Sequence, residues 1–189
     1  MSQILIIPGR GGSGEAHWQS DLEQVLPRTV RVRQDDWDNP DLDGWAARID
    51  AAARKTRRPP LAIAHSFGCL ALAHAVLKLG TPLSGSFLVA PADPARFGFA
   101  DSLLLHDLDH PSDFLASTND PWLSFEKAVG MAEAWGSRFH VLGEVGHINV
   151  ASGFGPWPEM RKWARLGCVA RSSYGGGRWL DAESARVSA

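Results

Sequence analysis

Short apolar runs alternate with longer amphipathic stretches along the first 165 residues of the chain. A short continuous apolar run is typical of a strand covered on both faces, whereas the stretches between the runs place apolar residues at helical spacing. Strands that alternate with helices predict an α/β fold, with a mostly parallel sheet and helices on both faces. We expect six strands, at residues 3–7, 29–33, 61–65, 86–90, 113–117 and 138–142.

The helix that follows the second strand has the clearest start and stop signals. Asn39 is a good N-cap and Pro40 suits the first helical position, which predicts a helix from there to about Arg57. Lys55 lies in its last turn, and Pro59 lies just beyond its predicted end. The other helices are expected at residues 15–26, 69–79, 122–136 and 156–165.

The sequence AHSFG at residues 64–68 joins the third strand to the helix behind it. A strand, a sharp corner at Ser66 and a helix predict the nucleophile elbow of an α/β-hydrolase, in which the serine hydroxyl stands above the sheet. Only small residues fit two positions before and after such a corner, and these are Ala64 and Gly68. No other serine in the chain has Gly or Ala at both positions.

Candidate partners for Ser66 follow the last two strands. Asp120 follows the fifth strand, at the carboxyl edge where open parallel sheets collect functional groups. His147 lies in a loop after the sixth strand and completes the chain order Ser, Asp, His of this fold. Asp93, after the fourth strand, is the alternative acid, and His17 is the other histidine close to a loop.

The glycine-rich loop at residues 8–14 admits two interpretations. In a hydrolase, the backbone N–H of Arg10 would join that of Phe67 to bind the oxyanion. Alternatively, the glycines from Gly9 to Gly14 match the dinucleotide fingerprint, with Asp35 or Asp36 as the acid that binds the ribose. We favour the hydrolase, because the dinucleotide interpretation leaves the corner at Ser66 unexplained.

Composition narrows the class of partner. The net charge of −2 and the pI near 6.4 argue against nucleic acid or an anionic membrane as the main partner. Two cysteines provide neither a disulfide framework nor zinc spacing, and His106 and His110 lack a third ligand. No signal peptide or membrane span is evident, so we expect a cytoplasmic protein that needs no cofactor and no metal.

Several motifs together resemble one known family. They are the sequences at residues 7–12, 36–45, 64–68, 116–122 and 146–147. The chain is similar to the small single-domain serine hydrolases of the YdeN type, a group that includes a retinoblastoma-binding serine hydrolase. The resemblance runs from about Ile4 to Trp163, and implies a trimmed fold with no lid domain and the same Ser66, Asp120 and His147. It does not cover the chain after Arg165.

These observations predict one hydrolase domain at residues 1–167 and a poorly ordered tail at residues 168–189. We expect a serine hydrolase that cleaves a small acyl ester, or an amide, through an acyl-enzyme on Ser66. The alternatives are a binding module that keeps the fold without catalysis and, less favoured, the dinucleotide-binding protein. The physiological substrate and the oligomeric state are not predicted.

Overall fold

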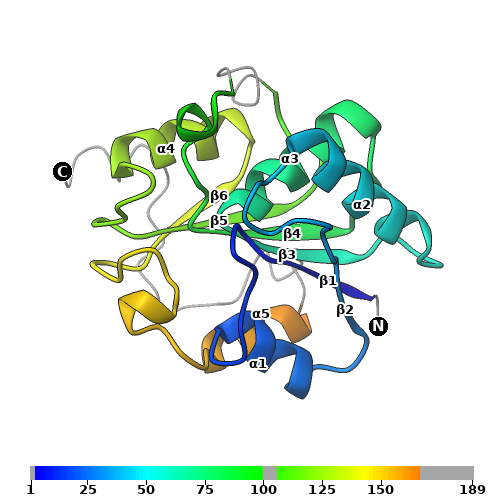
Figure 1. The fold of residues 1–189 in the computed structure, drawn as a ribbon, viewed down its shortest axis with the longest axis horizontal. Coiled ribbons are helices and arrows are strands. Elements are labelled where there is room, and N and C mark those ends of the chain that lie inside the picture. Colours follow the sequence, from blue (N-terminus) through cyan, green and yellow to red (C-terminus); the bar gives the residue numbers. More distant parts are fainter. Residues whose placement is uncertain (1–2, 100–105, 167–189) are drawn as a thin grey trace.

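A parallel sheet forms the centre of the molecule (Figure 1). The computed structural model describes residues 3–99 and 106–166, and all neighbouring strand pairs within this part run parallel. The strand order is β2-β1-β3-β4-β5-β6, which confirms the predicted α/β class and the six-stranded sheet. The strands are β1 (Ile4–Ile7), β2 (Thr29–Arg31), β3 (Leu61–His65), β4 (Gly85–Val89), β5 (Ser112–Ala116) and β6 (Arg138–Val141).

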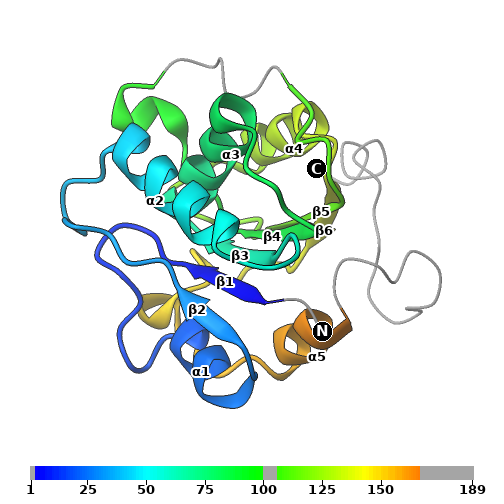
Figure 2. The ribbon, with the colours of Figure 1, turned by 90° about the vertical axis from the view of Figure 1, so that its right-hand side faces the viewer.

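Helices cover both faces of the sheet, as Figures 1 and 2 show. The helices are α1 (Trp18–Val25), α2 (Leu42–Arg54), α3 (Phe67–Leu79), α4 (Phe125–Ala134) and α5 (Pro158–Leu166). One core lies between the sheet and α2, α3 and α4, and it includes Trp45, Leu70 and Trp135. The other core lies between the sheet and α1 and α5, around Trp18 and Met160. Burial on both faces explains why the strands read as continuous apolar runs.

The order of the strands places a crevice above β1 and β3. From β1 the chain moves outward to β2, and it then returns to β3 on the other side of β1. The loops that leave β1 and β3 therefore diverge at the carboxyl edge of the sheet. Such a switch point is where open α/β sheets bind their ligands.

Helix α2 begins later than the sequence predicts. Its N-cap is Asp41, whose carboxylate accepts from the N–H groups of Asp43 and Gly44. The expected cap, Asn39, instead takes part in a turn in which Asp36 accepts from its backbone and side-chain N–H groups. The prediction of a helix start at Asn39 is therefore wrong, because this turn supplies partners for its polar groups before the helix starts. The helix also ends at Arg54, three residues before the predicted Arg57.

Two further helices are shorter than predicted at their first turns. Helix α1 is capped by His17, so the expected start at residue 15 is too early. Helix α4 is capped by Ser124, which accepts from the N–H of Lys127, so the expected start at residue 122 is also too early. In both cases the polar residues before the helix belong to loops at the carboxyl edge of the sheet.

The segment between β4 and β5 is compact in its described part. Residues 90–99 and 106–111 contain the short 3-10 helix η1 (Pro94–Phe97) and no lid domain. The predicted tail at residues 168–189 lies outside the described residues. Within residues 3–99 and 106–166, every helix is too short or too polar to span a bilayer.

Candidate active site

Ser66 occupies a strained corner between β3 and α3. Its backbone has φ 54° and ψ −126°, a region that non-glycine residues rarely adopt. Close packing surrounds the corner, because a Cβ on Gly68 would lie 2.5 Å from the Pro8 carbonyl oxygen, and one on Gly9 2.7 Å from the Ser66 Cβ. Ala64 is fully buried in β3, so its methyl group fits where the usual motif has glycine. The corner has the geometry of a nucleophile elbow.

The structure brings Ser66, His147 and Asp120 into one hydrogen-bonded chain. The His147 Nε2 lies 2.8 Å from the Ser66 Oγ, and its Nδ1 lies 2.9 Å from each carboxylate oxygen of Asp120. An ionised carboxylate only accepts, so Nδ1–H donates to Asp120 and Nε2 is free to accept from the Ser66 hydroxyl. The side chains of His147 and Asp120 are only 6% and 4% exposed. This arrangement polarises the serine hydroxyl.

Backbone contacts fix the loop that presents His147. The His147 N–H donates to the Ser152 Oγ over 2.9 Å, and Gly146 and Ile148 on either side have positive φ angles of 60° and 50°. The Trp18 Nε1–H, from α1, donates to the Ile148 carbonyl over 2.8 Å. The loop is therefore held to the second core rather than exposed to solvent.

Asp93, the alternative acid, faces a different group. Its carboxylate lies 2.5 Å from the Lys127 Nζ and accepts from the N–H of Ala95, which caps η1. Asp120 instead has its Oδ1 within reach of the His147 ring and of the Trp122 N–H. The geometry favours Asp120 as the acid.

Two backbone N–H groups near Ser66 are unpaired. Among the described residues, neither the N–H of Arg10 nor that of Phe67 has a hydrogen-bond acceptor. The neighbouring Gly11 N–H, by contrast, donates to the Trp37 carbonyl over 2.8 Å. The Arg10 side chain turns away and donates from Nε to the Asp38 carbonyl. Free N–H groups are what an oxyanion site needs, and this role of Arg10 and Phe67 stays a prediction.

The acids of the dinucleotide interpretation lie outside the site. Asp35 pairs with Arg48, and Asp36 accepts from the N–H groups of Asp38 and Asn39. Neither residue lines the cavity beside Ser66. Nothing in their arrangement resembles a ribose-binding acid at the end of β2.

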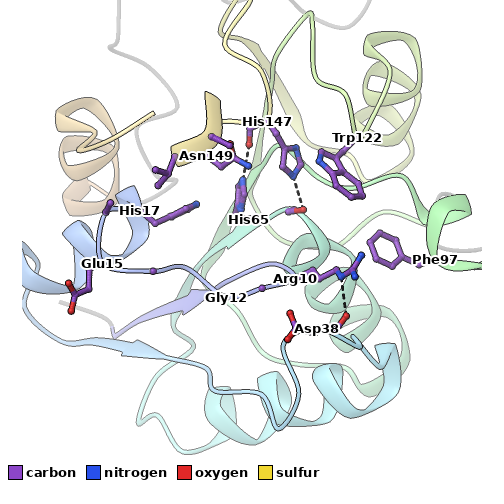
Figure 3. Close-up of a pocket in the computed structure, with 16 residues that line it drawn as sticks. Arg10, Gly12, Glu15, His17, Asp38, His65, Phe97, Trp122, His147 and Asn149 are labelled. Atoms are coloured by element: carbon purple, nitrogen blue, oxygen red, sulfur yellow. Dashed lines mark hydrogen bonds between the residues drawn. The ribbon is translucent and has the colours of Figure 1, made fainter. Parts of the chain in front are cut away.

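A cavity of about 620 Å³ opens above Ser66 (Figure 3). In this view His17 and Asn149 lie to one side of His147, and Phe97 and Trp122 lie to the other. Phe97, the last residue of η1, lines the cavity. The lining includes Arg10, Gly11, Gly12, Gly14, Glu15, Ala16, His17, Asp38, His65, Ser66, Phe97, Trp122, His147, Asn149, Val150 and Ala151.

Two more histidines form a row with His147: His65 lies against His147, and His17 lies against His65. From the sequence, His65 had no assigned role, and His17 was named only as the other histidine close to a loop. Ring centroids of His17 and His65 are 5.0 Å apart, as are those of His65 and His147. Burial, with smaller contributions from the charges of Arg31 and His147, lowers the pKa of His17 to about 4. Burial also lowers the pKa of His65 well below its usual range. Both rings are therefore neutral at pH 7. For His65, the hint in the sequence was its position directly before Ser66.

The described residues contain no group of three or more side chains suited to hold a metal ion. His110, from the histidine pair considered in the sequence, has its Nε2 2.9 Å from the Ser86 Oγ and its Nδ1 2.8 Å from the Leu108 carbonyl. Its ring nitrogens are thus engaged within the protein.

A comparison with protein families matches residues 4–165 to the serine hydrolases. The chain belongs to the serine hydrolase family. The match spans β1 to α5 and so includes Ser66, Asp120 and His147. A search of curated proteins finds no significant relative for this hydrolase.

Solved structures place this serine hydrolase among YdeN-like proteins. A protein described as a YdeN-like hydrolase, from Pectobacterium atrosepticum, is 40% identical, with a TM-score of 0.81 over 87% of this chain and 88% of its own. The ydeN gene product of Bacillus subtilis is 19% identical, with a TM-score of 0.71 over 86% and 96% of the two chains. Est1E from Butyrivibrio proteoclasticus, solved with ferulic acid, is 13% identical, with a TM-score of 0.67 over 90% of each chain, and shares the fold.

Proposed function

We propose that this serine hydrolase cleaves a small acyl ester through an acyl-enzyme on Ser66. The observation that carries the proposal is the hydrogen-bonded chain from Ser66 through His147 to Asp120. A serine is a weak nucleophile unless a base takes its proton, and a base is effective when a third group orients it. The short distances on both sides of the imidazole satisfy these requirements.

The roles follow from the positions of the atoms. As the Ser66 Oγ attacks the carbonyl carbon, His147 takes the hydroxyl proton on Nε2, while Asp120 holds the tautomer and stabilises the imidazolium. His147 then gives this proton to the departing alkoxide, so that the alcohol leaves and the acyl group stays on Ser66. Water, deprotonated by the same Nε2, attacks the acyl-enzyme and releases the carboxylic acid.

The carbonyl oxygen becomes negatively charged at each attack. The unpaired N–H groups of Phe67 and Arg10 are the groups we assign to this oxyanion. Losing one such donor in other serine hydrolases costs roughly 10²–10³ in turnover, so their alignment matters as much as the proton transfer. Gly9 and Gly68 let the loop carrying Arg10 lie this close to the corner.

An ester is the favoured substrate class over an amide. The described residues include no lid domain over Ser66, and the cavity walls combine aromatic rings with a few polar groups. Among the structures that share the fold are an esterase from Rhodococcus and a carboxylesterase from Bacillus cereus.

Covalent labelling with an alkyl fluorophosphonate tests the proposal. The intact protein should gain one adduct at Ser66, and its ester hydrolysis should disappear at the rate at which the adduct forms. Ser66→Ala should gain no adduct and should hydrolyse no ester. Ser84→Ala is the matched control, because Ser84 is exposed and lies at the opposite end of β4 from the site, and it should label like the intact protein. A folded protein that neither labels nor hydrolyses esters would contradict the proposal and favour a binding module.

A further inference from the structure

His17 is fixed in the wall of the cavity by the start of α1. The imidazole Nδ1 of His17 accepts from the backbone N–H of Gln19 over 3.1 Å, and the backbone N–H of His17 donates to the Gly14 carbonyl over 3.0 Å. The residue is only 6% exposed. Because Nδ1 accepts, the hydrogen of the neutral ring is on Nε2. The tautomer is therefore set by the helix cap.

The Nε2–H of His17 has no acceptor in the part of the chain that the structure describes. Its neighbours there are rings: the centroid of Trp18 is 5.2 Å away and that of His65 5.0 Å. The ring lines the cavity beside Ser66. Because the ring lines the cavity, a ligand oxygen placed there can accept from this donor.

Asn149 offers a second donor from the same wall. Its Oδ1 accepts from the Ser152 N–H and the Ser152 hydroxyl, each over 3.0 Å. A backbone N–H can only donate, so the side-chain atom of Asn149 that contacts Ser152 is the oxygen. The amide N–H₂ group of Asn149 therefore points away from Ser152. This group has no acceptor within residues 3–99 and 106–166, and Asn149 lines the cavity.

The other side of the cavity is aromatic. The Phe97 ring packs against Phe67 with centroids 4.7 Å apart. The Trp122 ring lies 5.9 Å from the His147 ring, and the Arg96 guanidinium lies 5.1 Å above Trp122. In Figure 3 these two cavity-lining rings, Phe97 and Trp122, lie across His147 from His17 and Asn149. The cavity thus has a polar end with fixed donors and an apolar end with flat walls.

We propose that His17, together with Asn149, binds an acceptor oxygen on one part of the substrate while Phe97 and Trp122 bind an apolar part on the other side of the ester bond. The inference rests on the proposed function and names its substrate class. That class is an ester with an aromatic or other flat apolar group on one side, and with a hydroxyl, ether or carbonyl oxygen on the other. His17 is in this proposal a residue that determines specificity.

Matched pairs of esters, in which one methylene is replaced by oxygen, test the proposal. The acyl series compares the p-nitrophenyl esters of pentanoate, ethoxyacetate and methoxypropanoate. The alcohol series compares butyl with methoxyethyl phenylacetate. Each kcat/KM is divided by the rate of hydroxide-catalysed hydrolysis of the same ester, which removes the inductive effect of the oxygen. In one of the two series we expect the oxygen-bearing ester to be preferred by roughly 3- to 10-fold, as for one neutral hydrogen bond.

The variant His17→Ser should bring this preference to about one. Serine still caps α1 at Gln19, and because the readout is a ratio within one variant, any loss of folded protein cancels. His74→Ser is the matched control, since His74 pairs with Asp43 outside the cavity, and it should keep the preference. A ratio of about one in both series of the intact protein, or a ratio that His17→Ser leaves unchanged, would overturn the proposal.

A binding measurement separates this inference from the proposed function. The variant Ser66→Ala is titrated with the same esters, and the ¹H and ¹⁵N signals of the His17 imidazole are followed by NMR. Oxygen-bearing esters should shift the Nε2–H proton downfield more than their methylene counterparts. If no ester is hydrolysed and no fluorophosphonate reacts, the proposed function fails, while this shift still decides the role of His17. Equal shifts for both members of every pair would contradict it.

Discussion

The imidazole of His65 and the backbone carbonyl of His147 are joined by a hydrogen bond of 2.9 Å. A carbonyl oxygen only accepts, so the ring donates from Nε2. Burial lowers the pKa of His65, so the ring is neutral and this donor persists across the physiological pH range. Because His65 directly precedes Ser66, the bond ties the strand that holds Ser66 to the loop that holds His147.

Substitution of His65 should slow catalysis more than it weakens substrate binding. In His65→Leu the carbonyl of His147 loses its donor, and a shift of the imidazole of about 1 Å would lower kcat by roughly 10²-fold with little change in KM. His65→Gln places an amide N–H₂ group near the position of Nε2 and should recover most of kcat. Steady-state kinetics of ester hydrolysis give both constants. Equal activity of the two variants would show that the hydrogen bond does not position His147.

The acid of the site can be identified by comparing two aspartates. Asp120→Asn removes the charge beside the His147 Nδ1 and allows the wrong tautomer, so kcat should fall by roughly 10⁴-fold, as the equivalent change does in other serine hydrolases. Asp93→Asn disturbs only the pair with Lys127 and the cap of η1, and should retain most of the activity. The two kcat values are measured on one ester at pH 8. Greater loss in Asp93→Asn would reverse the assignment.

Gly68 should tolerate no side chain. A Cβ there would lie 2.5 Å from the carbonyl oxygen of Pro8 and 2.7 Å from that of Ile7, so Gly68→Ala must displace the loop that carries Arg10. We expect a loss of about 1–3 kcal/mol in the free energy of unfolding, measured in urea, and slower fluorophosphonate labelling. Gly130→Ala is the matched control, because it lies in α4 with open space around it and should be neutral or stabilising by up to about 1 kcal/mol.

The protein should become less stable as the pH drops below neutral, in part because of His17. Its pKa is about 4 in the folded protein against an ordinary value of 6.5, so the unfolded chain binds the proton more readily as the pH falls through this window. The free energy of unfolding should therefore drop by about 2 kcal/mol from this group between pH 7.5 and pH 5. Urea unfolding at the two pH values measures the drop.

The variant His17→Asn isolates this contribution. Asparagine is a good N-cap and does not titrate, so the variant should lose about 2 kcal/mol less than the intact protein over the same pH interval. His65, whose pKa is lowered in the same direction chiefly by burial, remains in both proteins, so most of its contribution cancels in the difference. An identical pH dependence in the two proteins would contradict the pKa assigned to His17.

The ends of the helices show where local signals fail. Asn39 and Pro40 are good starting residues for a helix, yet the carboxylate of Asp36 binds the N–H groups of Asn39 and the helix starts after Asp41. A helix-capping preference ranks residue types by how well their side chains accept hydrogen bonds from the first N–H groups of a helix. It does not tell which of several nearby carboxylates reaches which N–H group, because that depends on how the loop packs.

The sequence by itself determined the alternation of strands and helices, the parallel sheet and the corner at Ser66, because burial on both faces and a tight strand-to-helix turn restrict residue type locally. It also gave the order of Ser66, Asp120 and His147 along the chain. Only the tertiary structure decided that Asp120 rather than Asp93 faces the imidazole of His147, that His65 lies against this imidazole, and that His17 lies against His65. These contacts join residues up to 82 positions apart, and their distances depend on how the loops pack across the edge of the sheet.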